Sequence, residues 1–74
     1  MARLPVVSGR ELVRALEKAG YVVDRQKSSH IVLRQTDTPF RRVTVPDHKE
    51  IAKGTLRSIL RHVGLTIDEL VRLL

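Results

Sequence analysis

The chain has 74 residues, no cysteine and no Cys/His cluster at metal-ligand spacing, so we expect one domain that apolar burial holds together, with no structural metal or cofactor. Its 14 Lys and Arg against 8 Asp and Glu give a net charge of +6, which favours a polyanionic partner such as nucleic acid, although such charge also serves solubility. No apolar run approaches the roughly 20 residues of a membrane span, and the N-terminus lacks a signal-peptide pattern, so we expect a cytoplasmic protein with no membrane partner.

The first expected element is a helix over residues 9–19. Ser8 is followed three residues later by Glu11, which is the spacing of a capping box, and Gly20 supplies a stop signal. The residues expected on the buried face of this helix are Leu12, Leu16 and Ala19.

Three strands are expected next, because from Tyr21 onward the apolar residues recur with a period of two and β-branched residues are frequent. The strands are expected at YVVDRQK (21–27), SHIVLRQ (29–35) and RRVTV (41–45). The short break at KSS suits a hairpin, and Asp37 and Pro39 in TDTP provide turn residues for a second one. The simplest topology is therefore an antiparallel sheet.

Two helices are expected in the rest of the chain. The first begins at Lys53 or Gly54 and ends at Gly64, and Thr66 forms a second capping box with Glu69 at the start of a short third helix. The apolar face of the longer helix is expected to hold Leu56, Ile59, Leu60 and Val63. The order α-β-β-β-α-α predicts an α+β two-layer sandwich, with helices on one face of a three-stranded sheet and the other face open.

Strand alternation places His30 on the open face of the sheet. Ile31 and Leu33 alternate with His30 and Arg34 along the second strand, and the aliphatic pair is expected to face the helices. The same logic in the third strand turns Arg42 outward, to the face that His30 and Arg34 occupy.

An exposed histidine among arginines has two interpretations. It can be a polar residue on the solvated side of a strand. It can also perform acid–base chemistry on RNA, because imidazole titrates near neutral pH and accepts a proton from a ribose 2′-hydroxyl, while nearby guanidinium groups stabilise the charge on the attacked phosphate.

The sequence resembles the HicA (YcfA-like) family of mRNA interferase toxins from about residue 8 to residue 71. The segments that carry the resemblance are RQKSSH, VPDH and GTLRSIL, in this order and at this spacing. Where the family pattern has a glycine before Ser-His, this chain has Ser28. Glycine at that position suits a hairpin residue with positive φ, so serine is expected to carry a conformational cost or to change the turn.

The resemblance implies a single toxin domain over residues 1–74, with a fold similar to double-stranded-RNA-binding domains. It implies the toxin of a type II toxin–antitoxin system that inhibits translation by cleaving mRNA without a metal or cofactor. It also implies neutralisation by a HicB-type antitoxin. The family's catalytic histidine corresponds to His30.

Several polar residues are expected to support His30. Ser29 is expected to orient the imidazole or the backbone, and the proton for the leaving oxygen is expected to come from His48, Lys27 or water. The residues expected to hold phosphate are Lys27, Arg34, Arg41 and Arg42. The alternative for His48 is a loop residue that bonds backbone, and His62 is expected to be structural, near a helix C-terminus.

Lys53, Arg57 and Arg61 recur at i, i+4 and i+8 of the second helix. They form either a solvated helix face or a phosphate-binding ridge beside the free N–H groups of the helix N-terminus.

Two further functions stay open from the sequence. The same basic sheet and helix could bind structured RNA without cleaving it. Alternatively, the last two helices could form a helix-turn-helix unit that binds DNA, with Gly64 in the turn.

Overall fold

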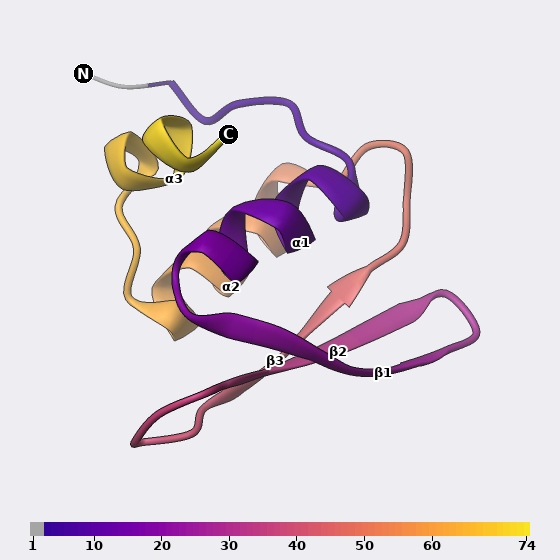
Figure 1. Ribbon diagram of the computed structural model, residues 1–74. Coiled ribbons are helices and arrows are strands. Elements are labelled where there is room, and N and C mark those ends of the chain that lie inside the picture. Colours follow the sequence, from indigo (N-terminus) through magenta and orange to yellow (C-terminus); the bar gives the residue numbers. More distant parts are fainter. Residues whose placement is uncertain (1–2) are drawn as a thin grey trace.

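The computed structural model describes residues 3–74, so the first two residues of the predicted domain lie outside the described part. The elements are α1 (Gly9–Lys18), β1 (Tyr21–Lys27), β2 (His30–Gln35), β3 (Arg42–Pro46), α2 (Lys53–Val63) and α3 (Ile67–Leu73). The predicted order α-β-β-β-α-α and the α+β class are confirmed (Figure 1). The likeness to double-stranded-RNA-binding domains stays a prediction.

Helix α1 begins at the predicted capping box. The Ser8 hydroxyl accepts a hydrogen bond from the Glu11 amide at 3.1 Å, and the Glu11 carboxylate accepts one from the Ser8 amide at 2.9 Å. The expected burial of Ala19 was wrong: this residue is the C-cap and is exposed. The helix ends at Lys18, one residue earlier than expected. Its buried face contains Val13 and Ala15 in addition to the two leucines.

The sheet has the strand order β1-β2-β3 with antiparallel neighbours, so β1 and β3 are its edge strands. A two-residue loop, Ser28-Ser29, joins β1 to β2, and Ser28 has a φ of 57°. A positive φ at the first loop position is typical of type II′ turns, in which glycine is preferred. The expectation that this position requires a positive φ is confirmed, and Ser28 carries the steric penalty that a Cβ atom meets there.

The pairing of β1 with β2 was left open by the sequence and contains an irregularity. Val23 pairs with Leu33 and Arg25 pairs with Val32, so Asp24 is an extra residue between them. Such a bulge shifts the side-chain phase of the rest of the strand. As a result, Arg25 and Lys27 lie on the open face with Val22, and Gln26 lies on the face of the buried Ile31.

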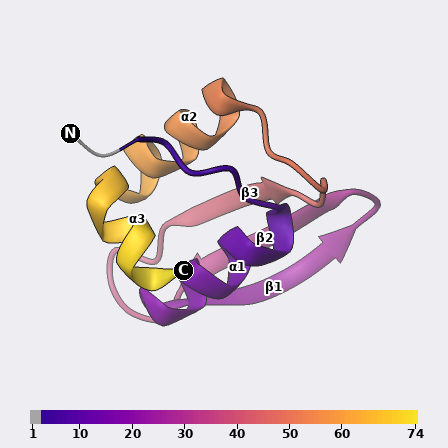
Figure 2. The same cartoon turned by 90° about the horizontal axis from the view of Figure 1, so that it is seen from above.

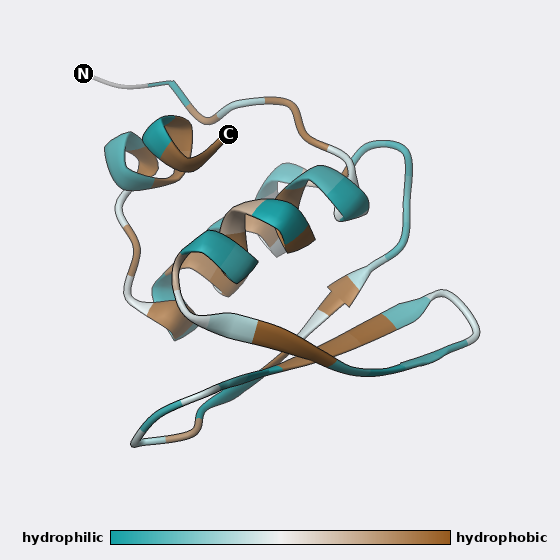
Figure 3. Cartoon of the chain, viewed as in Figure 1, coloured by the Kyte–Doolittle hydropathy of each residue, from teal (hydrophilic) through white to brown (hydrophobic). Residues whose placement is uncertain are grey.

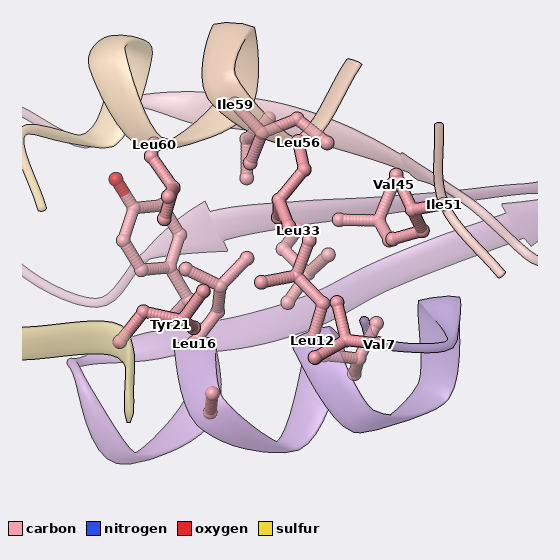
Figure 4. Close-up of a cluster of buried hydrophobic side chains, with 14 of the residues drawn as sticks. Val7, Leu12, Leu16, Tyr21, Leu33, Val45, Ile51, Leu56, Ile59 and Leu60 are labelled. Carbon is pink, nitrogen blue, oxygen red and sulfur yellow. The ribbon is translucent and has the colours of Figure 1, made fainter. Parts of the chain in front are cut away.

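Helices α1 and α2 cover one face of the sheet, with α2 running beside β3 (Figure 2). Hydrophobic residues occupy the first part of β1 and the middle of β2 (Figure 3). Ile31 and Leu33, which alternation assigned to the core, are buried, and so are Val43 and Val45 of β3. Leu33 is fully buried and lies with Leu12 and Leu56 in the core between the layers (Figure 4). Tyr21 is also buried in this core, and its burial raises the pKa of the phenol.

The two C-terminal helices also follow their local signals. Gly64 ends α2 with a φ of 76°, and Thr66 and Glu69 form the predicted capping box of α3. Helix α3 is attached to α1, because the Lys18 ammonium donates a hydrogen bond to the Leu73 carbonyl at 3.0 Å. Within residues 3–74, the helices are all too short or too polar to cross a membrane.

Candidate active site

The open face of the sheet carries His30 and several basic residues, among them Arg25, the partner of Val32. Lys27 is the direct partner of His30 across the first hairpin, and Arg34 is the direct partner of Arg42 across β2 and β3. Direct cross-strand partners share one face, and all four residues are exposed. Four residues along β2 separate His30 from Arg34, a span of about 13 Å. The structure therefore places Lys27 beside His30 and both arginines at the other end of the face.

The bulge residue Asp24 lies between the two arginines. Its carboxylate oxygens are 3.8 Å from the Arg34 Nε and 3.5 Å from an Arg42 guanidinium nitrogen. Exposed pairs of this kind contribute little to stability. Their main effect is electrostatic, because one carboxylate partly offsets two cations on a face that is otherwise basic.

At the other end of the sheet, His30 and His48 line the same hollow. This inner hollow has a volume of about 360 Å³. Its lining residues are His30, Thr44, Pro46, His48, Ala52 and Thr55. Both residues are exposed, so β2 and the loop after β3 bring two imidazoles to one accessible site.

The loop that carries His48 is fixed by contacts on both sides. The Asp47 amide donates to the Ser29 carbonyl at 2.7 Å, which joins this loop to the hairpin that carries His30. The Asp47 carboxylate also accepts hydrogen bonds from Arg10 at 3.2 Å and from Gln26 at 3.1 Å. Ser29 thus contacts this loop through its backbone, and its role beside His30 stays a prediction.

The inner hollow also adjoins the N-terminus of α2. Ala52 is the N-cap and has no side chain that can accept from the first N–H groups of the helix. Those N–H groups favour an anion through their own polarity and through the helix dipole. Ala52 and Thr55 line the hollow, so a phosphate there would lie near both histidines and this helix end.

A second, outer hollow continues between β3 and α2, with a volume of about 390 Å³. Its lining residues are Arg42, Val43, Thr44, Thr55, Ser58, Ile59 and His62. Thr44 and Thr55 line both hollows, which therefore adjoin at this pair. His62 is structural as expected, but by another contact: its Nε2 donates to the Arg42 carbonyl at 2.7 Å.

The remaining basic candidates do not gather around His30. Arg41 extends towards the C-terminal end of α2, where its guanidinium donates to the His62 carbonyl at 3.4 Å. Lys53, Arg57 and Arg61 are exposed, but they line neither hollow. At 3.6 residues per turn they follow a different stripe of α2 from the one that faces β3. Their roles in RNA binding stay predictions.

Two threonines of the site were missed as functional residues. Thr44 lies two residues after Arg42 in the third strand, and Thr55 lies in the motif GTLRSIL, but neither was assigned a role. The missing information was tertiary, because nothing local to either residue indicates that β3 and α2 lie side by side. For Thr55 the motif GTLRSIL offered a signal. It places the Thr55 hydroxyl in the first turn of a helix whose N-cap residue has no capping side chain.

The other predicted uses of the chain have less support. A DNA-reading α3 would carry Asp68 and Glu69 in its first turn, and both carboxylates would repel phosphate. Among residues 3–74, His, Asp and Glu side chains form no group of three or more that could hold a metal ion.

The comparisons with known proteins identify the family of the chain. The family model of the HicA toxin of bacterial toxin–antitoxin systems matches residues 9–65, a span that contains both histidines of the inner hollow and all of α2. A search of curated proteins found no match. Membership of this family implies the toxin of a toxin–antitoxin pair, a class that generally cleaves mRNA and has an antitoxin partner. The chain belongs to the HicA toxin family.

Proposed function

We propose that this toxin is a metal-independent endoribonuclease in which His30 and His48 transfer the protons. The observation that carries the proposal is that both imidazoles line one hollow beside the N-terminus of α2. Cleavage needs a base that takes the proton of the 2′-hydroxyl and an acid that protonates the leaving 5′-oxygen. Two imidazoles at one site can divide these roles.

The neighbours of the two histidines support stabilisation of the attacked phosphate. Lys27 is the cross-strand partner of His30, and the free N–H groups at the start of α2 border the same hollow. Fixed donors and cations stabilise the charge that develops on the phosphate oxygens. The 2′-oxygen attacks phosphorus as the bond to the 5′-oxygen breaks, which yields a 2′,3′-cyclic phosphate and a 5′-hydroxyl.

The assignment of roles favours His30 as the base and His48 as the acid. His30 lies on a strand beside Lys27, whereas His48 lies on a loop whose backbone is held by hydrogen bonds. Removal of the 2′-hydroxyl proton leaves negative charge on the attacking oxygen, and the Lys27 ammonium beside His30 would stabilise that charge. Lys27 is less suited as the proton donor because it is not among the residues that line the hollow.

Cleavage of a single-stranded oligoribonucleotide in EDTA tests the proposal. His30→Ala and His48→Ala are each expected to lose about 10²- to 10⁴-fold in kcat, and the exposed loop variant Lys49→Ala serves as the control. A substrate with sulfur at the 5′-bridging position has a leaving group that needs no protonation. It is therefore expected to restore cleavage by His48→Ala and not by His30→Ala.

The results separate the alternatives. Undiminished cleavage by folded His30→Ala would sink the catalytic assignment. RNA binding by the wild-type protein without any cleavage would support the non-catalytic RNA-binding module. If the sulfur substrate restores cleavage by both histidine variants, His30 and His48 do not divide the roles of base and acid.

We also propose that a HicB-type antitoxin covers the open face in the cytoplasm. The exposed residues Lys27, His30, Arg34 and Arg42 lie on this face, and the chain has a net charge of +6. An acidic partner would occlude His30 and offset that charge. The affinity is expected to fall with added salt and with Lys27→Glu, and a complex that leaves His30 open to solvent would contradict direct blockade.

A further inference from the structure

We propose that the outer hollow binds the nucleotide next to the scissile phosphate, so that the substrate is single-stranded RNA. This inference rests on the proposed function and adds to it the structural class of the substrate. It uses a surface that lies outside the two-histidine hollow and that the chemistry does not itself require.

The first argument is continuity. The inner and outer hollows share Thr44 and Thr55 and so adjoin along the edge of β3. A chain whose phosphate lies beside His30 and His48 can therefore extend directly into the outer hollow. Arg42 lines that hollow and supplies a cation for the next phosphate.

The second argument concerns the backbone of β3, which is an edge strand. The Arg41 carbonyl points towards β2 and accepts from the Gln35 amide, whereas the Arg42 carbonyl points the other way and accepts from His62. Backbone groups of successive residues alternate between the two sides of a strand. Thr44 lies two residues after Arg42, so its backbone groups point to the same side of β3 as those of Arg42. The Thr44 N–H and C=O therefore face α2 across the outer hollow.

A donor and an acceptor at a fixed spacing can read the edge of a base. In an RNA duplex the Watson–Crick edge is occupied by pairing, and sequence readers of RNA accordingly take unpaired bases. The Thr44 backbone groups and the hydroxyl of Ser58 offer such contacts from opposite walls of the hollow.

The third argument is size. The volumes of about 360 and 390 Å³ lie near the lower end of the range of small-molecule sites, roughly 300 to 1,000 Å³. Each hollow therefore suits one nucleotide. A duplex would need a broad surface that contacts two strands.

Ser58→Trp tests the proposal, because the indole would fill the outer hollow from an exposed position of α2. Trp and Ser have similar helix propensity. The matched control is Val71→Trp, a change without effect on charge at an exposed position of α3 that lines neither hollow. We expect Ser58→Trp to lose about tenfold or more in kcat/KM on a single-stranded oligoribonucleotide and Val71→Trp to stay within about twofold. The same oligonucleotide annealed to its complement is expected to be cleaved more slowly by the wild-type protein.

A binding measurement keeps the proposal testable if Ser58→Trp does not fold. A 2′-O-methyl oligonucleotide, which lacks the attacking hydroxyl, is titrated into the wild-type protein while amide resonances are followed. We expect the Thr44 and Ser58 amides to shift together with that of His48.

The possible results distinguish this inference from the proposed function. Wild-type cleavage that Ser58→Trp leaves intact, or shifts that spare Thr44 and Ser58, would overturn the nucleotide site alone. Loss of antitoxin binding by Ser58→Trp with normal RNA cleavage would show that the hollow holds a protein and would also overturn it. Absence of cleavage by the wild-type protein would remove the proposed function and this site together.

Discussion

The Gly9 amide donates a hydrogen bond to the His48 carbonyl at 2.8 Å, which fixes the start of α1 to the loop that carries the second histidine. A Cβ atom at Gly9 would overlap the backbone carbonyl oxygen of Pro46, which lies two residues before His48 at the end of β3. Glycine is therefore required here by close approach of two backbone segments. The site depends on this approach, because Pro46 and His48 both line the inner hollow.

Gly9→Ala is expected to lower the free energy of unfolding by about 2 kcal/mol or more, since the overlap can be relieved only by moving backbone. RNA cleavage is expected to fall as well, because the loop with His48 must shift. Gly54→Ala is the control, with no atom within 4 Å of the added Cβ. It lies in α2 and is expected to gain about 0.5 to 1 kcal/mol. Chemical denaturation measures both, and equal stabilities would contradict the close approach.

Ser28→Gly is expected to stabilise the first hairpin. The φ of 57° at Ser28 costs a residue with a Cβ atom about 1 kcal/mol, and glycine removes this cost at the expense of some unfolded-state entropy. Ser29→Gly is the comparison within the same loop. The Ser29 φ is not positive, so this change is expected to destabilise. If the two variants shift the melting temperature in the same direction, the strain at Ser28 does not affect stability.

Asp24→Asn is expected to increase the affinity for RNA and to steepen its salt dependence. The change removes the carboxylate that Arg34 and Arg42 share, which frees two cations for phosphate contacts. Asp68→Asn makes the same change in net charge on α3, away from the sheet. Binding of a 2′-O-methyl oligonucleotide at several salt concentrations compares them. Equal gains for both variants would show that net charge alone is responsible.

The stability of the fold is expected to decrease in acid through the capping boxes. The hydrogen bond from the Ser8 amide, followed by that from the Ser8 hydroxyl, lowers the pKa of Glu11 below its ordinary value of 4.5, and Thr66 lowers the pKa of Glu69 in the same way. A lowered pKa in the folded state gives stability that is present above the unfolded value and lost as the pH falls through the folded value.

Urea denaturation between pH 6 and pH 2.5 checks this expectation. Glu11→Gln is expected to reduce the loss of stability in the window at and below 4.5, and Ser8→Ala is expected to do the same because it removes one of the two hydrogen bonds. If both variants lose stability with falling pH as the wild-type protein does, the capping box of α1 contributes nothing to the acid sensitivity.

The sequence determined the elements and their faces, because both are set by short repeats and local signals. The capping boxes at Ser8 and Thr66 and the turn at Gly64 gave the helix ends. A period of two placed His30 on the open face, since the side chains of a strand alternate whatever lies around it. The family motifs assigned the chain to the HicA toxins before any geometry was known.

Only the tertiary structure decided which of the candidates come together. The contact of Gly9 with His48 and that of Ser29 with Asp47 join segments far apart in the sequence, and no local pattern encodes them. These contacts put His30 and His48 at one hollow. The packing of α2 against β3 added Thr44 and Thr55 to the site and directed Arg41 and the Lys53, Arg57 and Arg61 stripe elsewhere. The physical reason is that a side chain's direction follows from its own strand or helix, whereas its neighbours depend on how the whole core packs.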